Sequence, residues 1–213
     1  MSVAAMRVLA CAALLVGQAA WAGTSPDAPP PAAVEIGGQS IALPPPPGWV
    51  RVDTTSNEAR APFTRFVSRN ERVLAGFAPR MDDREFPSGA SLMKLALAAS
   101  TVSLESEDIT PARFAEILAV FRENLPDAEI VVQGPDALGL LVLVQAQTET
   151  GELMPEYVSA TLMLFARVKS RFVRLGMFDF TATAASAETF KATAIGWLVA
   201  LRAANGGGAQ PAM

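Results

Sequence analysis

The chain has 213 residues, of which 51% are hydrophobic, and it carries 17 Lys and Arg against 21 Asp and Glu. The net charge of −4 argues against a nucleic-acid-binding protein, a class that is usually basic. The chain has no histidine and only one cysteine, Cys11, which excludes the histidine-dependent catalytic triads and the usual ligand sets of zinc and copper.

Residues 1–22 have the three-part order of a cleavable secretory signal peptide. Arg7 supplies the positive charge, residues 8–20 are almost wholly apolar, and small side chains at Ala20 and Ala22 occupy the two positions that signal peptidase inspects. We therefore expect cleavage between Ala22 and Gly23 and export to the periplasm, with release outside the cell as the open alternative.

Two other interpretations of this segment fit less well. A transmembrane helix needs about 20 apolar residues, and neither this run nor any later one is long enough, so no membrane span is expected after cleavage. A lipoprotein would be anchored through Cys11, but the apolar run before Cys11 is short and continues beyond it. Cleavage would remove the only cysteine, so the mature chain would fold without disulfides.

The first half of the mature chain predicts short strands. Residues 23–33 are rich in proline and predict an extended leader, and a single globular domain is expected over residues 34–205. Within that domain, strands are predicted as a pair at 34–43 around Gly37 and Gly38, at 50–52 and at 72–78, whereas 63–68 fits a strand or the end of a short helix and 81–89 a loop.

Residues 91–103 give conflicting signals. Met93, Leu95, Leu97 and Ala99 alternate with other residues, which favours a strand, whereas the leucine and alanine content favours a helix. We predict a strand here.

An amphipathic helix is predicted from Thr110 to Leu125. Thr110 is a favoured N-cap residue, Pro111 suits the first helical position, and apolar residues follow at helical spacing. Strands are then predicted at 129–133 and 138–147.

The last part of the chain predicts a hairpin and a second helix. The hairpin consists of residues 157–168 and 172–180 and turns at Lys169 and Ser170. The helix runs from Ser186 to Ala203 with one apolar face, and residues 206–213 predict a disordered tail. Strands that follow one another with only two strong helices predict the α+β class, with a largely antiparallel sheet packed by those two helices.

Three features of this order carry a resemblance. They are a proline-rich turn into Gly48 and Trp49, a threonine-capped helix with Phe114, and a long hairpin leading into a terminal helix that holds Trp197. The chain resembles uncharacterised exported proteins of Gram-negative bacteria, and its layout is similar to the PsbP-like fold. The resemblance is one of layout over most of residues 35–205. It implies a helix-backed antiparallel sheet and no catalytic residues.

Four basic residues surround the tip of the predicted hairpin: Arg167, Lys169, Arg171 and Arg174. In an acidic chain this excess predicts a possible contact for an anion or a partner protein. The simpler interpretation is solubilising charge on a hairpin that would otherwise aggregate.

Three other patterns have simple structural explanations. Ser91 and Lys94 match the S-x-x-K motif of penicillin-binding enzymes, but the accompanying motifs are missing or misplaced. Two acidic clusters lack the spacing of a calcium loop and fit solvated loops. The first consists of Asp82, Asp83 and Glu85, and the second of Glu105, Glu107 and Asp108. The aromatic residues Trp49, Phe114, Phe121, Phe190 and Trp197 could line a ligand cavity, but core packing explains them more simply.

These observations single out no catalytic, cofactor-binding or metal-binding residue, and no cofactor is predicted. The favoured hypothesis is a non-catalytic exported protein that binds an envelope protein or a small apolar ligand. The alternative is a carboxylate-based hydrolase of envelope glycans, which needs two carboxylates in one cleft. A scaffold tethered by the proline-rich leader is a third possibility.

Overall fold

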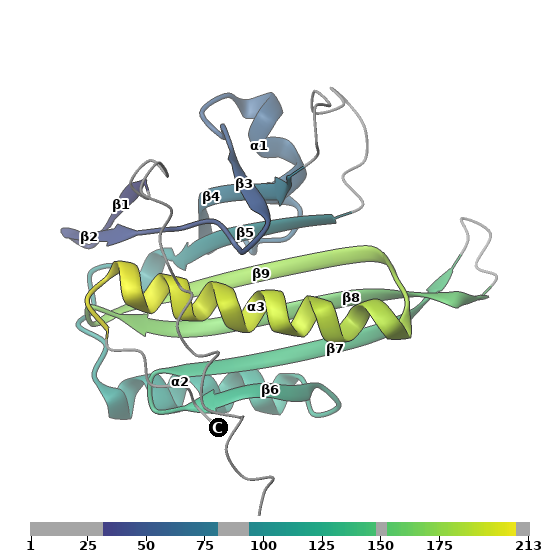
Figure 1. Ribbon diagram of the computed structural model, residues 1–213. Coiled ribbons are helices and arrows are strands. Elements are labelled where there is room, and N and C mark those ends of the chain that lie inside the picture. The colour runs from purple at the N-terminus through teal and green to yellow at the C-terminus, as the bar shows by residue number, and fades with distance from the viewer. Residues whose placement is uncertain (1–31, 81–93, 148–152, 208–213) are drawn as a thin grey trace, which may run out of the picture. The chain divides into compact units, whose positions relative to one another are not determined.

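A seven-stranded antiparallel sheet forms the centre of the protein, as a computed structural model shows (Figure 1). The structure describes residues 32–80, 94–147 and 153–207, all within one compact unit, Pro31–Met213. In the described part of the chain the strand order is β3-β4-β5-β9-β8-β7-β6, and β1 and β2 form a separate hairpin. The strands are β1 (Ala33–Ile36), β2 (Gln39–Ala42), β3 (Trp49–Val52), β4 (Glu71–Pro79), β5 (Lys94–Thr101), β6 (Glu129–Gly134), β7 (Ala137–Gln147), β8 (Leu153–Val168) and β9 (Arg171–Ala182).

The two faces of this sheet are covered by different helices. The helix α3 (Ala184–Ala204) and the β1–β2 hairpin pack on one face, where they share the largest core cluster with side chains from β4 to β9. On the opposite face, α2 (Pro111–Asn124) packs on β7, β8 and β9, and α1 (Asn57–Thr64) packs on β4 and β5. The α+β class predicted from the sequence is therefore confirmed.

Helix α3 is fixed at both ends. At its start, Thr183 and Ser186 form a capping box in which each side chain accepts the other's backbone N–H. Near its end, the buried Trp197 donates from Nε1 to the carbonyl of Pro44 at 2.7 Å, and Asn205 bonds both backbone groups of Ala42 at 2.9 Å. These contacts join α3 to the segment around β2.

Helix α2 begins as the sequence predicts. The Thr110 side chain accepts the backbone N–H of Arg113, and Pro111 occupies the first turn. Phe114 is fully buried, and Phe121 stacks on Phe165 of β8 with ring centroids 4.1 Å apart. The aromatic contacts hold α2 against the sheet along its length.

The ambiguous segment 91–103 is mostly a strand. Lys94–Thr101 forms β5, in which Leu95, Leu97 and Ala99 face α1, and the alanines between them face α3. The predicted strand is too long at its end, because Val102–Leu104 forms a 3₁₀ turn, η1. Residues 91–93 lie outside the described residues.

The segment at 63–68 follows the helical alternative. Phe63 and Thr64 end α1, a third helix that the sequence did not predict as a complete element. Phe63 is fully buried, and its ring lies so close to Gly76 of β4 that a Cβ there would overlap it. In the described residues, no helix combines the length and the apolar character needed to cross a membrane.

Candidate binding groove

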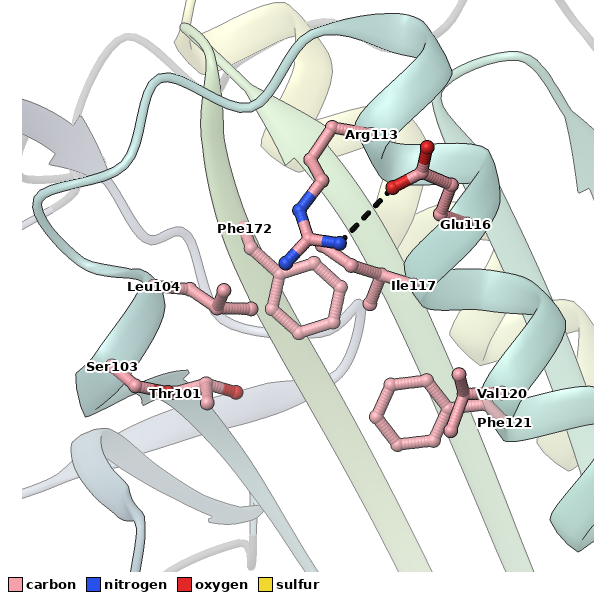
Figure 2. Close-up of a pocket in the computed structure, with 9 residues that line it drawn as sticks. All are labelled: Thr101, Ser103, Leu104, Arg113, Glu116, Ile117, Val120, Phe121 and Phe172. Carbon is pink, nitrogen blue, oxygen red and sulfur yellow. Dashed lines mark hydrogen bonds and ion pairs between the residues drawn. The ribbon is translucent and has the colours of Figure 1, made fainter.

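An open groove lies on the α2 face of the sheet, between α2 and η1 (Figure 2). Its volume is about 260 Å³. The lining residues come from β5 and η1 (Thr101, Ser103 and Leu104), from α2 (Arg113, Glu116, Ile117, Val120 and Phe121) and from β9 (Phe172). Two neighbouring segments, at 101–104 and 113–121, and the distant Phe172 therefore build one surface, which we call the α2 groove.

The walls of the α2 groove are mainly apolar. Leu104 and Ile117 lie on opposite sides of the groove. Phe121 and Phe172 stack with their ring planes inclined by 8°. Val120 keeps 55% of its surface exposed at the mouth, and Val102 of η1 keeps 51%. Because Val120 lies beside the other apolar groups of the lining, the groove is a candidate surface for contact with a partner.

One end of the groove carries charge. Arg113 donates from Nη1 to Glu116 at 3.1 Å (Figure 2). It also donates from Nε to Glu107 at 2.8 Å. The hydrogen bonds to Glu107 and then to Glu116 raise the pKa of Arg113 above its ordinary value. Two carboxylates on one guanidinium leave this cluster with a net negative charge.

The η1 side of the groove is held to the sheet by a second cluster. Glu105 accepts hydrogen bonds from Ser100 Oγ and from Arg72 Nε, the latter at 2.9 Å. Burial raises the pKa of Glu105, but the hydrogen bonds from Arg72 and Ser100 outweigh it, and the pKa is lowered on balance. The backbone N–H of Val102 also bonds the carbonyl of Asn70 at 2.8 Å, so the position of η1 is well defined.

The four basic residues of the hairpin all make contacts inside the protein. Arg167 lies 2.6 Å from Asp136 as an ion pair, and the exposed Lys169 donates to the carbonyl of Ser40 at 2.9 Å. Their use as an anion or partner site remains a prediction. Their contacts support an intramolecular role.

Arg171 and Arg174 are buried, on opposite faces of β9. Arg171 donates to the carbonyls of Glu107 at 2.7 Å and Gly37 at 3.1 Å, and its buried Nε has no acceptor in the described part of the chain. Arg174 pairs with Glu71 at 2.5 Å. Both guanidinium groups join segments of the fold that are distant in sequence.

The acidic clusters and the S-x-x-K pattern are only partly described. Glu105, Glu107 and Asp108 bind three different arginines, namely Arg72, Arg113 and Arg171. Among the described residues, no three acidic side chains gather as metal ligands would. Lys94 pairs with Asp179 at 2.9 Å, while Ser91 and the cluster at 82–85 lie outside the described residues.

The aromatic candidates divide between the core and the groove. Phe190 and Trp197 are buried in the core cluster under α3, and Phe114 is buried in the cluster under α2. Trp49 is half-buried and packs against the cluster under α3. Phe121 alone of the five lines the α2 groove. The sequence predicted Phe172 at the start of a strand, but no sequence signal showed that η1 and α2 lie beside it.

The carboxylates at the groove do not resemble a glycosidase pair. Glu107 and Glu116 accept hydrogen bonds from the same guanidinium. A glycosidase instead holds its two carboxyl groups on either side of the scissile bond, with space for the sugar between them. In this groove Arg113 fills the space between the two carboxylates.

Comparison with known proteins adds little to this geometry. No protein-family model and no curated protein sequence matches the chain. Among solved structures, the Ran-binding protein Mog1p of Saccharomyces cerevisiae is 16% identical with a TM-score of 0.32, covering 76% of this chain and 82% of the Mog1p chain. A point mutant of Mog1 is 16% identical with a TM-score of 0.33, covering 76% and 83% of the two chains.

Proposed function

We propose that this protein is exported to the periplasm and works there as a non-catalytic binding protein, with the α2 groove as its site. The observation that carries the proposal is the exposed Val120 at the mouth of a groove whose walls are apolar. A contiguous apolar surface that stays open to solvent supports a binding role, and Val120 extends the apolar walls of the groove to its mouth. The signal-peptide pattern of residues 1–22 supports export.

The size of the groove limits what it holds. Sites for small molecules usually enclose roughly 300–1,000 Å³ and bury most of the ligand. The α2 groove, at about 260 Å³, is smaller and open to solvent. It suits a few apolar side chains of a partner protein better than a fully enclosed ligand.

Native mass spectrometry of the mature protein purified from the periplasm tests this function. We expect the wild-type protein to carry an added mass and the Val120→Glu variant to lose it, because a charge at the mouth opposes burial of an apolar group. Ala119→Glu is the matched control, since Ala119 is also exposed on α2 and lies outside the groove lining.

Two results would contradict the proposal. One is a wild-type protein that carries no added mass in any preparation. The other is an added mass that Val120→Glu and Ala119→Glu retain equally, because the partner would then bind elsewhere.

A further inference from the structure

The charged end of the α2 groove gives information about the partner. Glu107, Arg113 and Glu116 together have one more negative than positive charge, and the side chain of Glu116 is 67% exposed. An incoming carboxylate would have to compete with two acids that already bind Arg113. An incoming cation would find Glu116 with one hydrogen bond to Arg113 and most of its surface in solvent.

The direction of the groove indicates the secondary structure of the partner. Arg113, Glu116, Ile117 and Val120 stand at positions i, i+3, i+4 and i+7 of α2, so the groove follows about two helical turns. The far side is η1, whose Leu104 faces the same space (Figure 2). A second helix laid along α2 would place side chains of the same spacing into the groove.

Resting on the binding function proposed above, we infer that the partner of the α2 groove is a basic amphipathic helix of another protein. Its leucine-like side chains enter between Leu104 and Val120. Its Lys or Arg, about one helical turn away, pairs with Glu116. The net negative charge of the chain, −4, favours the approach of such a segment.

The inference is tested with two synthetic peptides and a fatty acid. The first peptide is an amphipathic helix with leucines at i, i+3, i+4 and i+7 and flanking lysines, and the second has glutamates in place of the lysines. Dodecanoate is the third probe, because it combines an apolar chain with a carboxylate. Each is titrated into isotope-labelled mature protein, and the amide signals of Leu104 and Val120 report binding by nuclear magnetic resonance.

Binding of the lysine peptide is expected to depend on named residues. Val120→Glu should weaken it by about tenfold, equal to ~1.4 kcal/mol, since a valine contact is lost. Glu116→Gln should weaken it by about two- to fivefold, the usual range for an exposed ion pair. Ala119→Glu should leave the affinity unchanged or slightly increased.

The remaining outcomes separate this inference from the proposed function. If the glutamate peptide or dodecanoate binds the groove as tightly as the lysine peptide, the inferred partner chemistry is wrong and the binding function stands. If none of the three probes shifts Leu104 or Val120, the inference of a helical partner is overturned. The native mass measurement then decides on its own whether the groove binds anything.

Discussion

At the scale of single residues, the turn between β1 and β2 places two adjacent glycines in different surroundings. Gly37 and Gly38 both have positive φ, +52° and +76°, a region that other residues occupy only with strain. A Cβ added to Gly37 would overlap the carbonyl oxygen of Glu105, whereas one added to Gly38 would meet nothing within 4 Å. Of the two glycines, Gly37 is therefore the one that lies close to the loop after η1.

Replacing each glycine by alanine separates the two effects. Gly38→Ala should lower the free energy of unfolding by about 1 kcal/mol, the cost of a left-handed alanine. Gly37→Ala adds a backbone overlap to that cost and should lower it by about 3 kcal/mol or more. Urea denaturation of the two variants measures the difference, and equal losses would show that the hairpin moves freely away from Glu105.

The buried pair of Arg174 and Glu71 gives a second prediction at this scale. The two side chains are only 6% and 13% exposed, and Arg174 also donates to the carbonyl of Phe66 at 2.9 Å. Glu71→Ala leaves a buried guanidinium without its carboxylate, so we expect a loss of about 3 kcal/mol in the free energy of unfolding.

The control for this pair is Glu188→Ala. Glu188 binds Lys191 at 2.8 Å, but its side chain is 76% exposed, so solvent screens the pair and little change is expected. Thermal denaturation of both variants measures the contrast. A Glu71→Ala protein as stable as the control would mean that Arg174 finds another acceptor.

The basic residues of the hairpin show what the sequence leaves undetermined at this scale. The pattern predicted the turn at Lys169 and Ser170, and both residues do have positive φ, +47° and +60°. It did not predict that Arg171 and Arg174 are buried, because their acceptors are distant in sequence. Arg171 donates to Glu107 and Gly37, 64 and 134 residues away, and Arg174 donates to Glu71, 103 residues away. A local excess of charge indicates exposure only when no distant acceptor exists.

At the scale of elements, the sequence predicted a helix or strand correctly where the residues of that segment alone determine its structure. The alternation in β5 predicted a strand correctly, because Leu95, Leu97 and Ala99 face one side of the sheet and Ala96 and Ala98 face the other. Thr110 and Pro111 predicted the start of α2 for reasons local to that turn. Helix α1 was harder to predict, since Pro62 lies inside it and its single buried residue, Phe63, gives no periodicity.

The N-cap of α2 can be tested directly. Thr110 Oγ1 accepts the backbone N–H of Arg113 at 3.2 Å, a bond that Thr110→Ala removes. We expect a loss of about 1 kcal/mol in the free energy of unfolding, measured by urea denaturation. Thr110→Ser keeps the hydroxyl group and should lose much less, so a serine variant as unstable as the alanine variant would show that the cap contributes nothing.

The η1 turn gives a prediction about pH. The pKa of Glu105 is lowered in the folded protein, because the hydrogen bonds from Arg72 and Ser100 outweigh the effect of burial. A lowered folded pKa means that the stabilisation is present above the ordinary glutamate value of about 4.3 and is lost as the pH falls below it. The free energy of unfolding of the wild-type protein should therefore decrease below that pH.

Variants assign this acid sensitivity to η1. Glu105→Gln should be less stable than the wild type at neutral pH and should lose less stability on acidification, because one titrating group is gone. Glu123→Gln, an exposed residue of α2, serves as the control and should follow the wild-type pH curve. Parallel curves for wild type and Glu105→Gln would show that η1 is held by other contacts.

At the scale of the whole molecule, the α2 groove depends on topology. Strand β5 lies next to β9 in the sheet although about 70 residues separate them in the chain, and this pairing brings Leu104 beside Phe172. Composition and periodicity predicted α2, β9 and most of β5, but they did not predict the η1 turn and gave no information on how these segments pair. The class of the fold was therefore predictable and the candidate site was not.

Export is the last prediction, and it concerns the whole chain. Every residue that the structure describes lies after the predicted cleavage point between Ala22 and Gly23, so the predicted mature chain contains all the described strands and helices. We expect the periplasmic form to begin at Gly23, which a measurement of its intact mass can show.

Ala22→Arg should block cleavage, because signal peptidase requires a small residue there. Trp21→Leu is the control, since it changes a position between the two inspected residues and should be processed normally. A full-length wild-type protein that stays in the cytoplasm would contradict export. The α2 groove would then have to be tested against cytoplasmic partners.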